Sequence, residues 1–173
     1  MAYLKSGHNR AAAATGPMSE VVTDSTSRMA DGDLQAIAVY LKDQPASNTE
    51  PGRPAGDDPT MRAGEAIYAD NCAACHTASG EGVSHLFPAL KGSPSTQSAD
   101  PTSLIRVVLQ GARSAATDRA PTAPAMPALD WKLSDAQVAA VLTYIRNAWD
   151  NAAPTVSAGD VRRSRSELAH SAQ

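Results

Sequence analysis

Cys72, Cys75 and His76 form a Cys-x-x-Cys-His run near the middle of the chain. The chain has two cysteines in all, so neither thiol has a third cysteine as a disulfide partner. The spacing brings both thiols and the imidazole onto one turn, where they can meet one edge and one face of a flat macrocycle. Such a run is typical of covalent haem attachment, in which the thiols add to the vinyl groups and the histidine binds the iron. The rest of the chain must therefore enclose a large, flat, apolar group.

Two other kinds of site contain a Cys-x-x-Cys pair, and the sequence favours neither. A thioredoxin-like dithiol lies in a βαβ unit, whereas the residues around this pair predict helix and loop. A structural zinc site needs four ligands, usually with a second close pair of cysteines or histidines. No such pair is formed by the remaining histidines, which are His8, His85 and His170. We therefore predict one covalently bound haem c.

A haem iron that binds one histidine has a second axial position, and Met126 is the best candidate for it. Met126 lies between Pro124 and Pro127, and two prolines favour a stiff, extended backbone. Such a segment can hold a thioether against the haem face opposite the histidine, and histidine–methionine ligation favours electron transfer over oxygen chemistry. The alternative is that Met126 only fills a gap in the core. Met61 is a poorer candidate because it precedes the helix that carries the cysteines and so lies on the proximal side in sequence. His85 is poorer because it is too near His76 in sequence to reach the opposite face easily.

The composition suits a small domain built around a cofactor. Aromatic residues make up 4% of the 173 residues, so a large apolar group would supply much of the core. The net charge of −3 argues against a nucleic-acid-binding surface, and no apolar run of about eighteen residues predicts a membrane-spanning helix. The alanines at 11–14 are too few for the apolar core of a signal peptide. Because haem c is attached outside the bacterial inner membrane, we expect a truncated piece of a longer exported protein.

Changes in composition divide the chain into four parts. Residues 1–43 include a helical apolar stripe across 31–42. Residues 44–60 are rich in proline and glycine and predict an extended linker. Residues 61–150 are the predicted haem domain, and residues 151–173, basic and poor in apolar side chains, predict a solvated, mobile tail. Because a lone helix of about ten residues is marginal in water, we expect residues 1–43 to be poorly ordered and separate from the haem domain.

Within the haem domain the periodicity predicts three helices and no convincing strand. The first spans 62–71, directly before the cysteines. The second runs from Asp100, its expected cap, to Gly111. The third opens with a capping box between Ser134 and Gln137. Its apolar stripe consists of Val138, Val141, Leu142, Ile145 and Trp149.

Together these features resemble a class I cytochrome c domain, which has an all-α fold. The shared positions are Gly64, Tyr68, the Cys-x-x-Cys-His run, Gly80, Gly82, Phe87, Pro88, Leu90, Met126, Pro127, Leu142 and Tyr144. In that family the first and last helices cross at a glycine and aromatic residues, which Gly64, Tyr68 and Tyr144 match. The resemblance also implies that the carbonyl of Pro88 accepts a hydrogen bond from the proximal imidazole, which would fix the tautomer of that ligand.

A closer resemblance is to the third haem domain of three-haem cytochrome subunits, and three segments carry it: residues 87–90, 100–111 and 131–138. Those subunits serve membrane-associated alcohol, gluconate and sorbitol dehydrogenases of the bacterial periplasm. The resemblance implies a dehydrogenase catalytic subunit as partner, membrane quinone or a downstream oxidase as acceptor, and a periplasmic location at the inner membrane. Residues 1–43 would be a helical remnant of the preceding haem domain. Met18 would match a distal ligand whose haem attachment site is absent here, or else be an ordinary methionine.

These expectations predict an electron-transfer subunit or fragment of an oxidoreductase complex, not an enzyme in itself. Cys72 and Cys75 would tether the haem, and His76 and Met126 would bind its iron. Arg113 either pairs with a haem propionate or is solvated. Two other functions remain open: a peroxidase-like enzyme, which needs an open sixth position on the iron, and a haem-based sensor, which is normally joined to an output domain.

Overall fold

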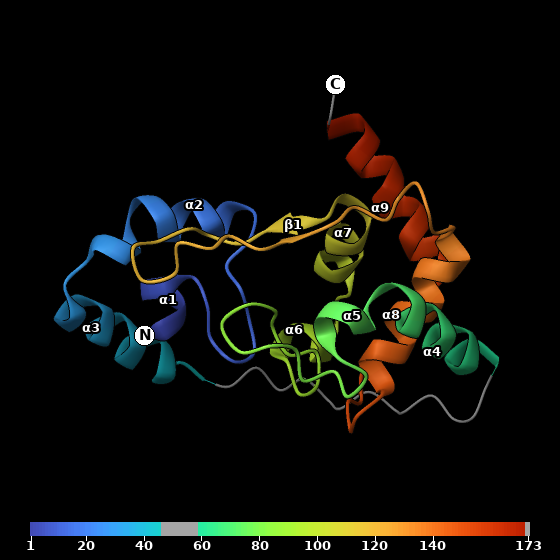
Figure 1. Cartoon of the computed structure of the whole chain (residues 1–173), viewed down its shortest axis with the longest axis horizontal. Helices are drawn as coiled ribbons and strands as arrows, with labels where there is room; N and C mark the ends of the chain where they lie inside the picture. Colours follow the sequence, from blue (N-terminus) through green and yellow to red (C-terminus); the bar gives the residue numbers. More distant parts are fainter. Residues whose placement is uncertain (46–58, 172–173) are drawn as a thin grey trace.

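The computed structural model describes residues 1–45 and 59–171, and these residues are mostly helical (Figure 1). This confirms the expected all-α class. The elements in chain order are α1 (Ala2–Ser6), α2 (Pro17–Asp24), η1 (Thr26–Arg28), α3 (Asp31–Lys42), α4 (Pro59–Asn71), α5 (Ala73–His76), α6 (Pro94–Gln97), α7 (Thr102–Gln110), β1 (Ala112–Arg113), β2 (Ala125–Met126), α8 (Asp135–Asn147) and α9 (Ala158–Ser171). Figure 1 shows α1–α3 on one side of the molecule and α4–α9 on the other, with the segment around β1 running between them.

The helices α4 and α8 cross at a glycine, as the resemblance implies. A Cβ atom on Gly64 would lie 2.3 Å from the carbonyl oxygen of Ala140 and 2.7 Å from Cβ of Tyr144. Only glycine allows two helices to approach so closely. Beside the crossing, three aromatic rings meet, with centroid distances of 5.6 Å for Tyr68–Tyr144, 5.0 Å for Tyr68–Trp149 and 5.5 Å for Tyr144–Trp149. Tilted and edge-on rings at these distances attract one another beyond simple burial.

The expected helix α8 is the centre of the core. Its capping box is present: Ser134 Oγ accepts from the Gln137 amide at 3.3 Å, and Gln137 Oε1 accepts from the Ser134 amide at 2.9 Å. The expected apolar stripe of α8 is buried at Val138, Val141, Leu142 and Ile145. Trp149 lies beyond the end of the helix and is half-buried. Neighbours on several sides bury this helix, because α4, α7 and α9 all pack against it.

The helix α7 begins one residue later than the sequence predicts. Asp100 Oδ1 accepts from the Thr102 amide at 2.9 Å, so it still satisfies a free donor at the start of the helix. Gly111 ends the helix with φ of 73°, and a Cβ there would lie 2.5 Å from the carbonyl oxygen of Met126. That close approach belongs to the short antiparallel ladder of β1 and β2, in which Ala112 pairs with Met126. The sequence predicted no strand, because two-residue strands leave no periodic pattern.

The tail was expected to be solvated and mobile, and the structure differs from that expectation. Residues 158–171 form α9, which packs against α7 and α8 and fully buries Val161. The guanidinium of Arg165 donates to Asp135 Oδ1 at 2.9 Å and to the carbonyl oxygen of Leu133 at 3.0 Å. In the segment just before α9, the carbonyl oxygen of Pro154 accepts from the buried guanidinium of Arg146 in α8 at 2.9 Å. Arg165, one of the charged side chains that suggested a solvated segment, therefore holds the segment on the domain.

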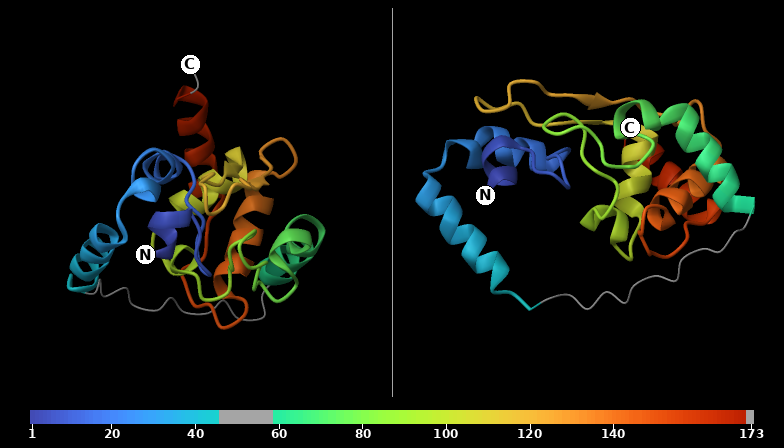
Figure 2. Two further views of the ribbon diagram at one scale, coloured as in Figure 1. Left: turned by 60° about the vertical axis from the view of Figure 1, so that its left-hand side comes forward. Right: turned by 60° about the horizontal axis from the view of Figure 1, so that its bottom comes forward.

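The N-terminal part also differs from the expectation that it would stand apart. The helix α3 covers the apolar stripe expected at 31–42, but only Leu34 of that stripe is fully buried. The residues before it pack against the loop after β1, where Ala14, Val22 and Ala115 form a small buried cluster. Figure 2 shows this part lying along that loop. The separation was inferred from the linker predicted at 44–60, of which residues 46–58 lie outside the described residues.

No helix in the described ranges is both long and apolar enough to cross a membrane.

Candidate haem site

The Cys-x-x-Cys-His run forms a tight turn directly after α4. The amide of Cys72 donates to the carbonyl oxygen of Tyr68 at 2.9 Å, and the amide of His76 donates to that of Cys72 at 2.9 Å. Both cysteines are free, with Cys72 half-buried and Cys75 exposed. Burial, with a smaller contribution from Cys75, raises the pKa of the Cys72 thiol to about 11. A redox-active dithiol has the opposite shift, toward a stabilised thiolate.

The imidazole of His76 is oriented by the loop that follows it. Its Nδ1 lies 3.1 Å from the carbonyl oxygen of Pro88. A carbonyl can only accept, so Nδ1 is the donor and Nε2 keeps its lone pair for a metal. Burial lowers the pKa of His76, and the hydrogen bond to Pro88 opposes that shift. The hydrogen bond expected from the resemblance is thus present.

A glycine lets the loop close tightly enough to place Pro88. Gly82 has φ of 66°, and a Cβ on it would lie 2.3 Å from the carbonyl oxygen of Phe87 and 2.7 Å from that of Pro88. The amide of Gly82 also donates to the carbonyl oxygen of His76 at 3.0 Å. The backbone between the imidazole and its acceptor is therefore compact and cross-linked.

Two aromatic side chains hold the backbone just after His76. Thr77 has φ of 62°, which is unusual for a residue with a side chain. Its carbonyl oxygen accepts from Tyr68 Oη at 2.6 Å, and the next carbonyl, of Ala78, accepts from Trp149 Nε1 at 3.1 Å. Both donors belong to the aromatic group beside the α4–α8 crossing. The crossing therefore supports the turn that carries His76.

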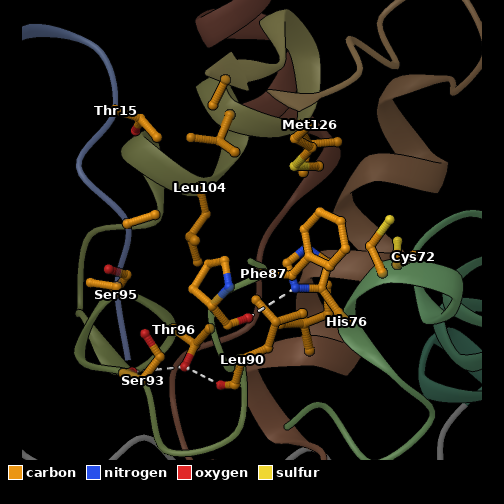
Figure 3. A pocket seen from close by; sticks show the side chains of 18 of the residues that line it. Thr15, Cys72, His76, Phe87, Leu90, Ser93, Ser95, Thr96, Leu104 and Met126 are labelled. Carbon is orange, nitrogen blue, oxygen red and sulfur yellow. Dashed lines mark hydrogen bonds between the residues drawn. The ribbon is translucent and has the colours of Figure 1, made fainter. Parts of the chain in front are cut away.

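Met126 lies on β2, held by its pairing with β1 and by the neighbouring prolines. The carbonyl oxygen of Pro124 accepts from the Ser114 amide at 3.1 Å. Figure 3 shows Met126 and His76 on facing sides of one cavity, with Cys72 to one side. The cavity has a volume of about 370 Å³, and Cys72, Cys75, His76 and Met126 all line it.

The rest of the lining is mostly apolar and includes Leu90, Leu104, Val108, Leu142 and Ile145. This donor set and this lining fit a haem: two thiols at one edge, an imidazole and a thioether on opposite faces, and apolar walls. Among the described residues, no three His, Cys, Asp or Glu side chains gather into a group that could hold a metal ion.

The other candidates from the sequence differ in their placement. Met61, His85 and Arg113 do not line the cavity. Arg113 is exposed and donates to the carbonyl oxygen of Ala123 at 3.1 Å, which favours the solvated alternative over the propionate partner. Met18, in α2, does line the cavity.

Sequence reasoning missed several lining residues: Tyr3, Ala11, Ala12, Ala13 and Thr15. Alanines carry no chemical signal, and these residues lie far from the haem motif in sequence. Only the docking of the N-terminal part brings them to the cavity.

A model of the cytochrome c family matches residues 61–149. The chain belongs to the cytochrome c family. This membership confirms the resemblance read from the sequence, and a cytochrome c domain implies a covalently bound haem c. The matched range contains both thiols and both candidate axial ligands and ends just after α8.

Longer relatives match nearly the whole chain. The alcohol dehydrogenase (quinone) cytochrome c subunit of Gluconobacter oxydans is 41% identical, over 94% of this chain and 36% of the relative. The gluconate 2-dehydrogenase cytochrome c subunit of Pantoea cypripedii is 39% identical, over 95% of this chain and 40% of the relative. The fructose dehydrogenase cytochrome subunit of Gluconobacter japonicus is 31% identical, over 94% and 39%. This chain thus spans about two fifths of the length of these relatives, and the match includes the N-terminal part as well as the cytochrome c domain.

Proposed function

We propose that this cytochrome c domain carries one haem c and transfers single electrons. One observation carries the proposal: two thiols, an imidazole with a free Nε2 and a thioether line the same apolar cavity. In this assignment Cys72 and Cys75 form the thioether bonds, His76 is the proximal ligand and Met126 the distal one. The bound haem supplies a one-electron couple at its iron.

The protein's own contribution is to fix the ligands and to exclude water. Pro88 orients the imidazole and raises its basicity through the hydrogen bond at Nδ1. The β1–β2 ladder and two prolines keep Met126 in place, and a thioether ligand raises the reduction potential. The apolar walls keep the surroundings of the iron at low polarity, which acts in the same direction.

We propose a dehydrogenase catalytic subunit as the electron donor. Relatives that match nearly the whole chain are named as cytochrome subunits of alcohol, gluconate and fructose dehydrogenases. The proposed acceptor is membrane quinone or a downstream oxidase, and the proposed location is the periplasmic face of the inner membrane. Residues 1–43 would correspond to the end of a preceding haem domain in the longer relatives, because the match continues through them.

The test starts from the chain expressed behind an export signal with a cytochrome-maturation system. Haem should stay on the polypeptide in a reducing, denaturing gel, and haem lost from the band would refute the attachment. Met126→Ala should abolish the thioether-to-iron charge-transfer band of the ferric protein and lower its reduction potential. Met18→Ala tests the other thioether at the cavity, and Met61→Ala is a control outside it. Both should keep the band, and a Met126→Ala protein with an unchanged spectrum would contradict the assignment.

The two rival functions differ in how the iron meets small ligands. A peroxidase or a gas sensor has an open or labile sixth position, whereas a stable Met126 ligand closes it. We expect the ferrous protein to bind carbon monoxide slowly and the Met126→Ala protein to bind it fast. Fast binding to the unmodified protein would favour a peroxidase or a sensor.

A further inference from the structure

A short N-terminal segment, residues 10–15, connects the two walls of the haem cavity. On the proximal wall, Ala89 directly follows Pro88, and its amide donates to the carbonyl oxygen of Arg10 at 3.3 Å. On the distal wall, Ala115 follows β1, and its amide donates to the carbonyl oxygen of Ala14 at 2.9 Å. One stretch of backbone is therefore bonded both to the loop that orients His76 and to the loop whose strand holds Met126.

Residues of the segment also form part of the cavity surface. Ala11, Ala12, Ala13 and Thr15 line the same cavity as the cysteines and the axial ligands. The carbonyl oxygen of Ala11 accepts from the buried hydroxyl of Ser93, another lining residue, at 3.0 Å. The segment is thus a wall of the haem site and not a distant extension.

The segment lies at the edge of the cavity away from the cysteines. In Figure 3, Thr15, Ser93 and Ser95 lie on one side, and Cys72 lies on the other. In the proposed assignment the cysteines would bind the vinyl edge of the porphyrin, so the propionates would lie toward the opposite edge. The hydroxyls of Thr15 and Ser95 can donate hydrogen bonds to carboxylates there.

The docking of the segment depends on a small, tightly packed cluster. Ala14 and Val22 are 0% exposed and Ala115 is 1% exposed. A Cβ on Gly7 would lie 2.9 Å from Cβ of Ala115, so no space remains beside the cluster. A larger or polar side chain at position 14 would force the segment away from the loop.

We propose that residues 10–15 form a strap that closes the propionate edge of the haem cavity and keeps water out of it. This inference rests on the proposed haem in the cavity. A closed edge lowers the polarity around the iron, which disfavours the ferric state because it carries one more positive charge. The strap thereby raises the reduction potential and shields the Met126 ligand from displacement.

The test compares the full haem-bearing chain with Ala14→Gln, a neutral change that places an unpaired amide in the buried cluster. The matched control is Ala116→Gln, which makes the same change at the exposed position directly after Ala115. In Ala14→Gln we expect the reduction potential to fall and cyanide to displace the methionine faster. The amide of Ala115 should exchange with solvent roughly tenfold faster or more. The control should match the unmodified protein in all three measurements.

A milder variant covers the case in which Ala14→Gln does not fold. Ser93→Ala removes only the hydroxyl bond to Ala11 and should shift the same three measurements in the same direction by less. The proposed function is checked separately, by covalent haem and by the charge-transfer band of the unmodified protein. If both are present while potential, cyanide rate and Ala115 exchange stay unchanged in Ala14→Gln, or in Ser93→Ala where only that variant folds, the strap is refuted and the electron-transfer proposal stands.

Discussion

The crossing of α4 and α8 makes a quantitative prediction for Gly64→Ala. The new Cβ would lie 2.3 Å from a backbone oxygen and 2.7 Å from a Cβ atom, and neither of these atoms can rotate away. Ordinary contacts lie near 3.5 Å, so the helices must separate by roughly 1 Å. Overpacking of this kind costs about 3 kcal/mol at the upper end of its usual range. The higher helix propensity of alanine offsets about 1 kcal/mol of this cost, so the free energy of unfolding should fall by about 2 kcal/mol.

The assay is guanidinium unfolding of the haem-bearing chain, followed by far-ultraviolet circular dichroism. The matched control is Gly159→Ala in α9, where the nearest atom to the new Cβ is Ser157 Oγ at an ordinary 3.5 Å. The control should be as stable as the unmodified protein or slightly more stable. Because α4 leads directly into Cys72, Gly64→Ala should also weaken the charge-transfer band. A Gly64→Ala protein that unfolds at the same denaturant concentration as the control would refute the reasoning.

Two further predictions concern the C-terminal helix and the start of α7. Val161→Ala should lower the free energy of unfolding by about 2 kcal/mol, because the side chain is fully buried; a solvated tail would show no change in denaturant unfolding. Hydrogen bonds from Thr102, first from its hydroxyl and then from its amide, hold the pKa of Asp100 below its usual value. A lowered carboxyl pKa stabilises the fold above the unfolded value of about 3.9, and this stabilisation is lost as the pH falls through the folded value. The stability difference between the unmodified protein and Asp100→Asn should therefore be largest near neutral pH and shrink below about pH 4, and a difference independent of pH would contradict it.

Local patterns predicted those parts of the fold that depend on neighbours in sequence. The capping box at Ser134 and the end of α7 at Gly111 both appear where the sequence places them. A cap or a helix stop is decided within about four residues, so no distant contact is needed to identify it. The Cys-x-x-Cys-His turn is of the same kind, and its residues lie at the cavity.

The family resemblance also predicted two contacts between residues that are distant in sequence. It placed Gly64 at the crossing with α8 and Pro88 as the acceptor for the proximal imidazole. Neither contact follows from composition or periodicity, because each joins segments whose relative position depends on the whole fold.

Other features became visible only in the tertiary structure. The few apolar side chains of residues 158–171 predict no stable helix on their own, yet α9 forms because Val161 and Arg165 find partners on α7 and α8. The alanines at 11–13 carry no signal, yet they become a wall of the cavity once the carbonyl groups of Arg10 and Ala14 accept from the amides of Ala89 and Ala115.

The sequence by itself therefore determined the family, the helices around the Cys-x-x-Cys-His run and the set of candidate haem ligands. The tertiary structure decided how the cavity is closed, and the physical reason is that burial and backbone hydrogen bonds between distant segments depend on where the chain brings them. A local sequence pattern shows which side chains and caps are present. Only the packed chain determines which of them meet and which edge of the haem cavity they seal.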